Sequence, residues 1–194
     1  MKTGRLEAFS DGVLAIIITI MVLELKVPHE TDLESLLPIW PVFLSYILSF
    51  IYIAIYWNNH HHMLQAADRI NGSILWANMH LLFWLSLIPF TTAWMGENHF
   101  ATIPVALYGV VLFFAGLAYW ILEWCIVREH GPDSTLAKAV GRDWKGRLSN
   151  ILYAIAIAAA FVHPLIAGVI YAAVAVMWLV PDSRIEHALH QQAD

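Results

Sequence analysis

Uninterrupted apolar runs, separated by short polar segments, dominate the chain. The first run extends from Gly12 to Leu23, and no charged residue lies between Asp11 and Glu24. With its flanking turns it reaches the roughly 20 residues that one helix needs to cross about 30 Å of hydrocarbon. Similar runs recur and predict six membrane helices, over residues 5–25, 39–63, 73–95, 101–127, 148–163 and 165–180. We therefore expect a single all-α transmembrane domain that covers residues 1–194.

Composition agrees with this pattern. Hydrophobic residues make up 60% of the 194 positions, charged residues only 13%, and the mean hydropathy is +0.65. A soluble domain carries about 25% charged residues, so the composition indicates an integral membrane protein. The one cysteine, Cys125, excludes a disulfide framework within the chain.

Two parts of the second half depart from simple long runs. His163-Pro164 interrupts the last apolar stretch, which predicts a hairpin of two helices of roughly 15 residues each, short for full spans. Gly109 and Gly116 would let a neighbouring helix approach the helix over 101–127 closely. Residues 128–147 are polar and read as a basic cytoplasmic segment at the membrane surface, with Lys138, Arg142, Trp144, Lys145 and Arg147.

The basic residues predict the orientation in the membrane. If the N-terminus is cytoplasmic and six helices cross, only Lys26 lies outside. This asymmetry obeys the positive-inside rule and places both termini in the cytoplasm. The predicted outer loops carry an acidic set, which would either concentrate cations at the outer mouth or serve as ordinary solvated loop: Glu24, Glu30, Asp32, Glu34 and Glu97.

The first helix has two different faces. At about 100° per residue, Ile16, Thr19, Ile20 and Leu23 fall on one side, and Ser10 and Asp11 point away from it. These residues alone fit a plain structural interpretation, in which Ser10 or Asp11 caps the helix and the stripe packs on a neighbour.

The polar start of this helix carries a longer motif. The sequence reads R-x-x-x-F-S-D-G, formed by Arg5, Phe9, Ser10, Asp11 and Gly12, and continues with Ala15-Ile16 and Thr19. A second stretch has Trp57, Asn59, His60 and His61, then Asn78 and Pro89-Phe90. Together they resemble the transmembrane protein 175 family, the endolysosomal potassium channels and their prokaryotic relatives. Animal members carry two repeats, whereas this chain has one copy of the motif and so resembles the prokaryotic form. The second half matches only in its hydrophobic pattern.

This resemblance implies a function and an assembly. It implies passive permeation of potassium, with selectivity over sodium, through a homotetramer in which the first helix of each subunit lines a central pore. Ile16 and Leu23 would then form hydrophobic constrictions that close by dewetting, and Thr19 would offer hydroxyl oxygens to a partly dehydrated cation. Ile20 is a further candidate for the pore lining. Arg5, Phe9, Ser10, Asp11 and Gly12 would position the helix. No T-V-G-Y-G carbonyl filter is present in the sequence.

The predicted topology brings polar residues together at the cytoplasmic side. Asp11 would meet His60, His61, Asn78 and His80 there, and we expect its carboxylate to accept a hydrogen bond from a histidine of the second helix or from Asn78. Four of these residues, Asp11, His60, His61 and His80, support an alternative function, a proton-coupled transporter or proton pathway. Metal binding is disfavoured, because adjacent histidines on a helix point about 100° apart and cannot share one ion.

Motifs for other functions are missing from the sequence. It contains no G-x-S-x-G, no H-E-x-x-H and no glycine-rich phosphate loop, so we expect no enzyme and no cofactor. The expected partners are potassium ions, membrane lipid and further copies of the chain, and not nucleic acid. The expected location is the plasma membrane of a prokaryote.

Overall fold

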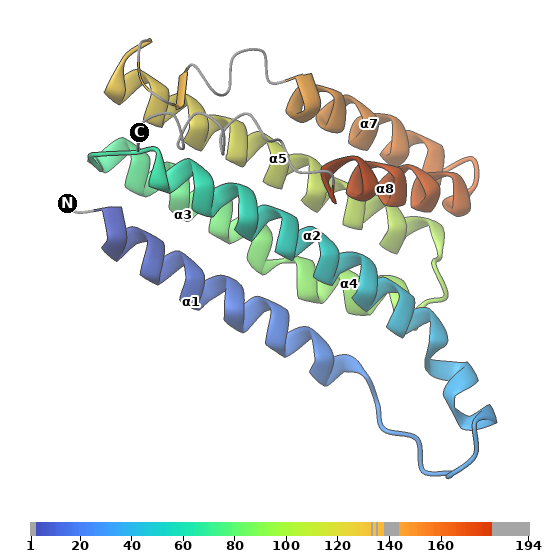
Figure 1. The fold of residues 1–194 in the computed structure, drawn as a ribbon. Helices are drawn as coiled ribbons and strands as arrows, with labels where there is room; N and C mark the ends of the chain where they lie inside the picture. The colour runs from blue at the N-terminus through green and yellow to red at the C-terminus, as the bar shows by residue number, and fades with distance from the viewer. Residues whose placement is uncertain (1–2, 133, 135, 138–143, 180–194) are drawn as a thin grey trace.

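Helices account for nearly all regular structure in the computed structural model, which describes residues 3–132, 134, 136–137 and 144–179. The long elements are α1 (Thr3–Met21), α2 (Trp40–Gln65), α3 (Gly72–Ser86), α4 (Ile88–Glu97), α5 (Thr102–His130), α7 (Trp144–Ala160) and α8 (Pro164–Leu179). Two short 3₁₀ helices, η1 (Val22–Glu24) and η2 (Glu34–Ile39), flank the loop between α1 and α2. In Figure 1 that loop extends beyond the body of the bundle.

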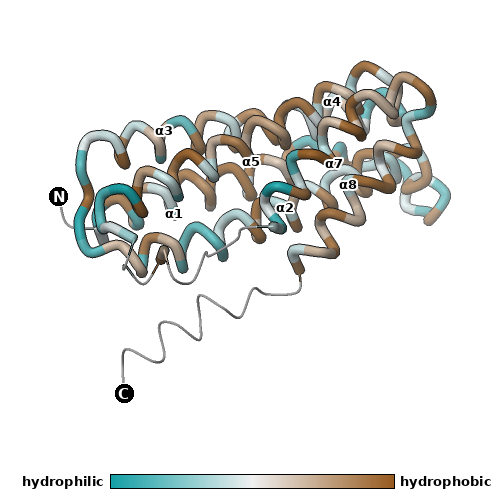
Figure 2. Tube along the Cα trace, turned by 90° about the horizontal axis from the view of Figure 1, so that it is seen from above, coloured by the Kyte–Doolittle hydropathy of each residue, from teal (hydrophilic) through white to brown (hydrophobic). Residues whose placement is uncertain are grey.

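Within the described residues, four helical stretches are long and apolar enough to cross a membrane: Thr3–Glu24, Glu34–Gln65, Gly72–Glu97 and Thr102–His130. The apolar helix α8 is shorter. Along the tube in Figure 2, apolar residues occupy the bodies of the helices and hydrophilic residues gather toward their ends. The fold is therefore all-helical with the character of an integral membrane protein, as the sequence predicted.

The predicted helix over 73–95 is interrupted. It consists of α3 and α4, which meet at Leu87. Pro89 lies in the first turn of α4. Proline has no backbone N–H and its ring clashes with the preceding turn, so a continuous helix is disrupted just ahead of it.

The predicted basic segment over 128–147 is divided among other elements. Its first residues, through His130, continue α5, and its last residues begin α7 at Trp144. Lys138 and Arg142 lie outside the described residues. The α7 helix therefore starts earlier than the predicted residue 148.

Helix α5 lies at the centre of the packing and contacts α3, α4, α7 and α8, whereas α1 packs on α2, α3 and α4. Figure 1 accordingly shows α1 at one edge and α7 with α8 at the opposite edge.

The expected close approach at the α5 glycines is confirmed. A Cβ at Gly109 would collide with the Tyr171 hydroxyl of α8, and one at Gly116 with the Asn150 side chain of α7.

Candidate ion pathway and the network that supports it

One side of α1 is buried in the protomer. Its buried side chains recur every three or four residues, which is the period of a single helical face. They pack on the neighbouring helices and comprise Leu6, Ser10, Leu14, Ile17 and Met21. This face fixes the rotation of α1 about its own axis.

The opposite side of α1, called its free face below, is apolar and is left exposed by the other described helices. Ile16 is 60% exposed and Ile20 41%. Leu23 is 77% exposed, and it belongs to η1 and not to the continuous helix predicted over 5–25. Among the residues that the structure describes, the four expected to line a pore thus share an exposed face of the first helical segment.

Thr19 lies on this free face, and its hydroxyl hydrogen is already used. Its Oγ1 donates to the backbone oxygens of Ala15 (2.9 Å) and Ile16 (3.0 Å) within the helix. Because the hydrogen points back to the backbone, the oxygen lone pairs remain available on the exposed side. The side chain can therefore act as an acceptor toward a cation.

The R-x-x-x-F-S-D-G motif divides between the two sides of α1. Ser10 is fully buried, and Asp11 is partly buried at the α2 side. Arg5, Phe9 and Gly12 are exposed, and a Cβ at Gly12 would meet no heavy atom within 4 Å. Ser10 and Asp11 thus bond to neighbouring helices of the protomer, whereas the positioning role expected for Arg5, Phe9 and Gly12 stays a prediction.

Ser10 begins a buried chain of hydrogen bonds that joins three helices. Asn78 Nδ2 donates to Ser10 Oγ (3.0 Å), and His60 Nε2 lies 2.7 Å from Asn78 Oδ1. Since Oδ1 only accepts, His60 is the donor, and Ser10 Oγ passes its own hydrogen to the Leu6 carbonyl (2.9 Å). The directed chain from α2 through α3 to α1 locks the start of α1 in place.

Asp11 has a different partner from the one expected. Trp57 Nε1 donates to Asp11 Oδ1 over 2.9 Å, so the carboxylate is held by α2 but by neither a histidine nor Asn78. His61 pairs instead with Glu7, with 2.9 Å between Nδ1 and Oε1. Trp57 was part of the motif in the second stretch, and its indole N–H, an obligatory donor, was the signal for this contact.

His80 does not belong to the cluster. It is exposed on α3 and accepts a hydrogen bond from Trp84 Nε1 of the same helix (3.0 Å). Residues two apart on a helix point about 200° apart, so buried Asn78 and His80 cannot face the same neighbour. In the part of the chain that the structure describes, no three or more His, Cys, Asp or Glu side chains are grouped to hold a metal ion.

The Asp11–Trp57 bond can be tested through stability. Asp11→Ala is expected to lower the free energy of unfolding by about 1 kcal/mol, because the indole loses a charged acceptor at a partly exposed site. Asp11→Asn keeps an oxygen acceptor and should cost less. Thermal unfolding of the purified protein measures both. Asp32→Ala is the matched control, since that carboxylate accepts a local bond from the Ser35 backbone (2.9 Å). Equal stability of Asp11→Ala and the wild-type protein would contradict the role of this bond.

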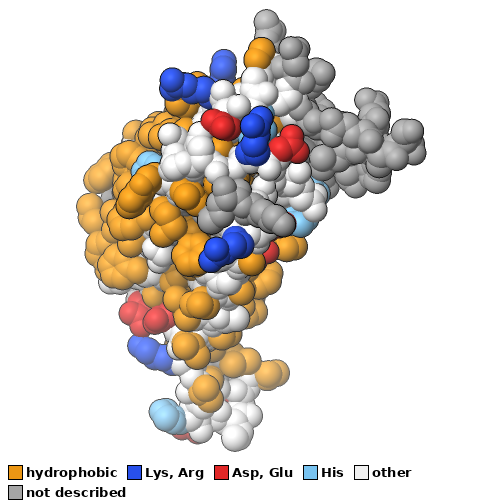
Figure 3. All heavy atoms as spheres, turned by 90° about the vertical axis from the view of Figure 1, so that its left-hand side faces the viewer, with side chains coloured by type: hydrophobic (Ala, Val, Ile, Leu, Met, Phe, Trp, Pro, Cys, Tyr) orange, Lys and Arg blue, Asp and Glu red, His pale blue; other side chains and the backbone are white. Residues whose placement is uncertain are grey.

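The other end of α1 carries an ion pair. Lys26 Nζ lies 2.8 Å from Glu97 Oε1, which links the loop after η1 to the end of α4. The hydrogen bond to the Glu97 carboxylate, together with its negative charge, raises the pKa of Lys26 above its usual value. Glu24, Lys26, Glu97 and His99 line a polar cleft beside it. Figure 3 shows charged side chains in the upper part of that view and a smaller charged group lower down, with apolar side chains over much of the surface.

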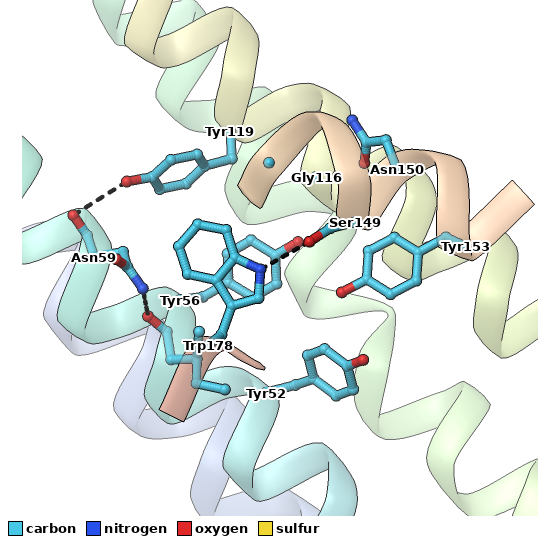
Figure 4. A pocket seen from close by; sticks show the side chains of 11 residues that line it. Tyr52, Tyr56, Asn59, Gly116, Tyr119, Ser149, Asn150, Tyr153 and Trp178 are labelled. Carbon is cyan, nitrogen blue, oxygen red and sulfur yellow. Dashed lines mark hydrogen bonds between the residues drawn. The ribbon is translucent and has the colours of Figure 1, made fainter. Parts of the chain in front are cut away.

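Sequence reasoning did not find a cavity of about 40 Å³ between α2, α5, α7 and α8. Figure 4 shows Trp178 of α8 lying among the tyrosines that line it. Its indole donates to Ser149 Oγ of α7 over 2.8 Å, and Asn150 Oδ1 is buried without a hydrogen-bond partner. The indole bond joins α8 to α7. The hairpin is fastened to α2 and α5 by tyrosine hydroxyls, since Tyr52 donates to the Tyr171 carbonyl (2.7 Å) and Tyr171 donates to the Val105 carbonyl (3.1 Å).

The fold and this site define the class of protein, a helical integral membrane protein. A bundle of membrane-crossing helices leaves an apolar stripe of its first helix uncovered, and a buried polar network fixes that helix. Comparison with known proteins identifies the family. The family model for the endosomal/lysosomal potassium channel TMEM175 matches residues 5–89. A potassium channel of Chryseobacterium sp. (strain P1-3) is 57% identical over 191 residues, which cover 98% of this chain and 100% of the relative. The chain belongs to the TMEM175 family.

A solved structure agrees. The crystal structure of a lysosomal potassium-selective channel TMEM175 homolog from Chamaesiphon minutus superposes with a TM-score of 0.77 at 29% identity. The match covers 93% of this chain and 97% of that one. More distant relatives include the endosomal/lysosomal proton channel TMEM175 of Danio rerio, which is 26% identical over 119 residues. This match covers 59% of the present chain and 22% of the relative.

Proposed function

We propose that this protein is a potassium channel in which four identical subunits surround a central pore lined by α1. The free apolar face of α1 is the observation that carries the proposal. A stripe on one helix cannot enclose a path for ions, but copies of it arranged around a symmetry axis can. Membership of the TMEM175 family, with relatives that are named potassium channels, supports the choice of ion.

The pore lining in this proposal is Ile16, Thr19, Ile20 and Leu23. Rings of isoleucine and leucine side chains exclude water when narrow, and so close the pore by dewetting. Thr19 lies between two such rings and presents hydroxyl lone pairs, since its hydrogen is bonded to the backbone. Selection of potassium over sodium would arise from the cost of dehydrating the smaller ion in this narrow passage.

The membrane arrangement follows from the charges. We place the N-terminal end of α1 and the C-terminal end of α5 in the cytoplasm, because Arg5, Arg69 and Arg128 lie at that end. In this arrangement α7 and α8 cross as a hairpin and complete six spans in the plasma membrane of a prokaryote. Lys26, Glu24 and Glu97 then lie outside.

The test uses purified protein in liposomes. With a potassium gradient across the membrane, flux should be passive, should scale with the driving force and should exceed flux from an equal sodium gradient. Chemical crosslinking in the same liposomes should give a species of four chains. Flux that saturates and requires a proton gradient would contradict a channel.

The proton-coupled alternative receives less support. The buried chain from His60 ends on a backbone carbonyl of Leu6, and a carbonyl cannot pass a proton onward. His80, one of the four residues assigned to that pathway, lies outside the cluster. Measurement of liposome pH during potassium flux separates the two functions.

A further inference from the structure

The turn between α2 and α3, residues 66–71, is held by side chains from two other helices. His130, the last residue of α5, accepts hydrogen bonds at Nε2 from the backbone N–H groups of Asp68 (3.1 Å) and Arg69 (3.0 Å). The start of α1 bonds to the same turn, where Thr3 Oγ1 donates to the Ala67 carbonyl (2.9 Å). The turn therefore connects the end of α5 to the beginning of α1.

The hydrogen bonds of His130 define its protonation state. Its Nδ1 lies 2.9 Å from the Ile126 carbonyl, an acceptor, so Nδ1 carries a hydrogen. Its Nε2 faces two N–H donors, so Nε2 carries none. The imidazole is therefore neutral in this arrangement. A protonated ring would direct a third N–H at two existing donors, and both contacts would be lost.

We propose that His130 is a proton-sensitive clamp, which holds the α2–α3 turn, and through it the start of α1, only while its imidazole is neutral. Histidine is the side chain suited to such a change between about pH 5 and 8. Protonation breaks the hydrogen bonds from the amides of Asp68 and Arg69, and so loosens the turn to which Thr3 is hydrogen-bonded. A consequence for ion flux rests on the proposed pore function, whereas the clamp itself does not.

Charged residues of both signs neighbour His130 along the chain and in the turn that it contacts. The turn contributes Asp68 and Arg69, and α5 contributes Arg128 and Glu129, two of each sign. Glu129 also accepts a hydrogen bond from Asn71 Nδ2 (2.6 Å), so it is partly occupied. Other charged or titratable residues toward this end of the described chain are Arg5, Glu7, His61, His62, Glu123, Lys145 and Arg147.

The experiment measures backbone amide hydrogen exchange of the segment 64–72, corrected for the intrinsic effect of pH. In the wild-type protein, exchange should be about tenfold faster at pH 5 than at pH 8, because two backbone hydrogen bonds are lost. His130→Gln retains an oxygen acceptor that does not titrate, so its corrected exchange should stay slow at both pH values. His130→Phe has no acceptor and should exchange fast at both.

His163→Gln is the matched control. His163 also accepts a backbone N–H, from Leu165 over 3.2 Å, but in the α7–α8 turn. In His163→Gln, the backbone amides of residues 64–72 should exchange at the wild-type rate at both pH values. The proposal is wrong if wild-type exchange is the same at both pH values, a result that needs no variant. It is also wrong if His130→Gln retains the wild-type pH dependence, which would point to His61 or His62.

Potassium flux in liposomes gives a separate readout. Wild-type protein and His130→Gln should conduct potassium equally at pH 8. Their potassium fluxes should differ when the compartment that the α2–α3 turn faces is at pH 5. Absence of potassium flux in every variant, with the exchange result intact, would reject the proposed function and leave the clamp standing.

Discussion

Ile16→Asn is expected to increase cation flux and to reduce the preference for potassium over sodium. In the proposed pore, each copy would replace an apolar side chain with an amide that holds water, and the dewetted barrier would fall. A barrier lower by about 1.4 kcal/mol raises flux by about tenfold. Flux of potassium and of sodium into liposomes measures both effects.

Leu23→Ala should act in the same direction, because it widens a second apolar ring of the proposed pore. Leu23 is 77% exposed in the protomer, so the shorter side chain leaves the packing of α1 intact. Matched controls are Ile151→Asn and Leu165→Ala, on the α7–α8 hairpin, where the native side chains are 57% and 68% exposed. If the α1 variants conduct like these controls, α1 does not line the pathway.

Helices with a long apolar run could be predicted from the sequence, because a helix that crosses a membrane needs such a run. The existence of α1, α2 and α5 follows from apolar runs that, with their flanking turns, reach the length needed to cross the hydrocarbon core. The break at Leu87 was missed, although Pro89 stood in the sequence. A proline within an apolar run either kinks a helix or ends it, and the choice depends on packing by neighbouring helices.

The partners within the polar cluster were harder to predict. Trp57 and His60 are three residues apart on α2, so they differ by about 60° in direction and about 4.5 Å along the axis. A small shift of α1 decides which of them meets Asp11, and a sequence pattern does not contain that shift. The sequence alone could have excluded His80 from the polar cluster, because Asn78 and His80 point to nearly opposite sides of α3.

The same limit applies to the motif at the start of α1. Its letters identify a family but do not separate residues that pack from residues that face outward. The buried face, through Ser10 and Leu14, makes that division clear, and it leaves Arg5 and Phe9 on the free side. These two residues extend the uncovered face toward the cytoplasmic end, where contacts between subunits would begin in the proposed tetramer.

Asn78→Leu is expected to destabilise the protein by about 2–3 kcal/mol. Leucine is close in size, but it removes the acceptor for His60 and the donor for Ser10, both fully or almost fully buried. The His60 Nε2–H is then left in an apolar site without a partner, which carries the full desolvation cost. Thermal unfolding in detergent should show a melting temperature lower by roughly 5–10 °C.

Two further variants separate a network from simple packing. Asn98→Leu is the control, because Asn98 is exposed and bonds only locally to the Trp94 carbonyl (2.8 Å). His60→Leu combined with Asn78→Leu should cost less than the sum of the single changes, since each single change strands the other partner. Additive costs would mean that the two side chains contribute independently. The start of α1 would then be held by its apolar face alone, and the motif at Ser10 would have no part in fixing the rotation of the proposed pore helix.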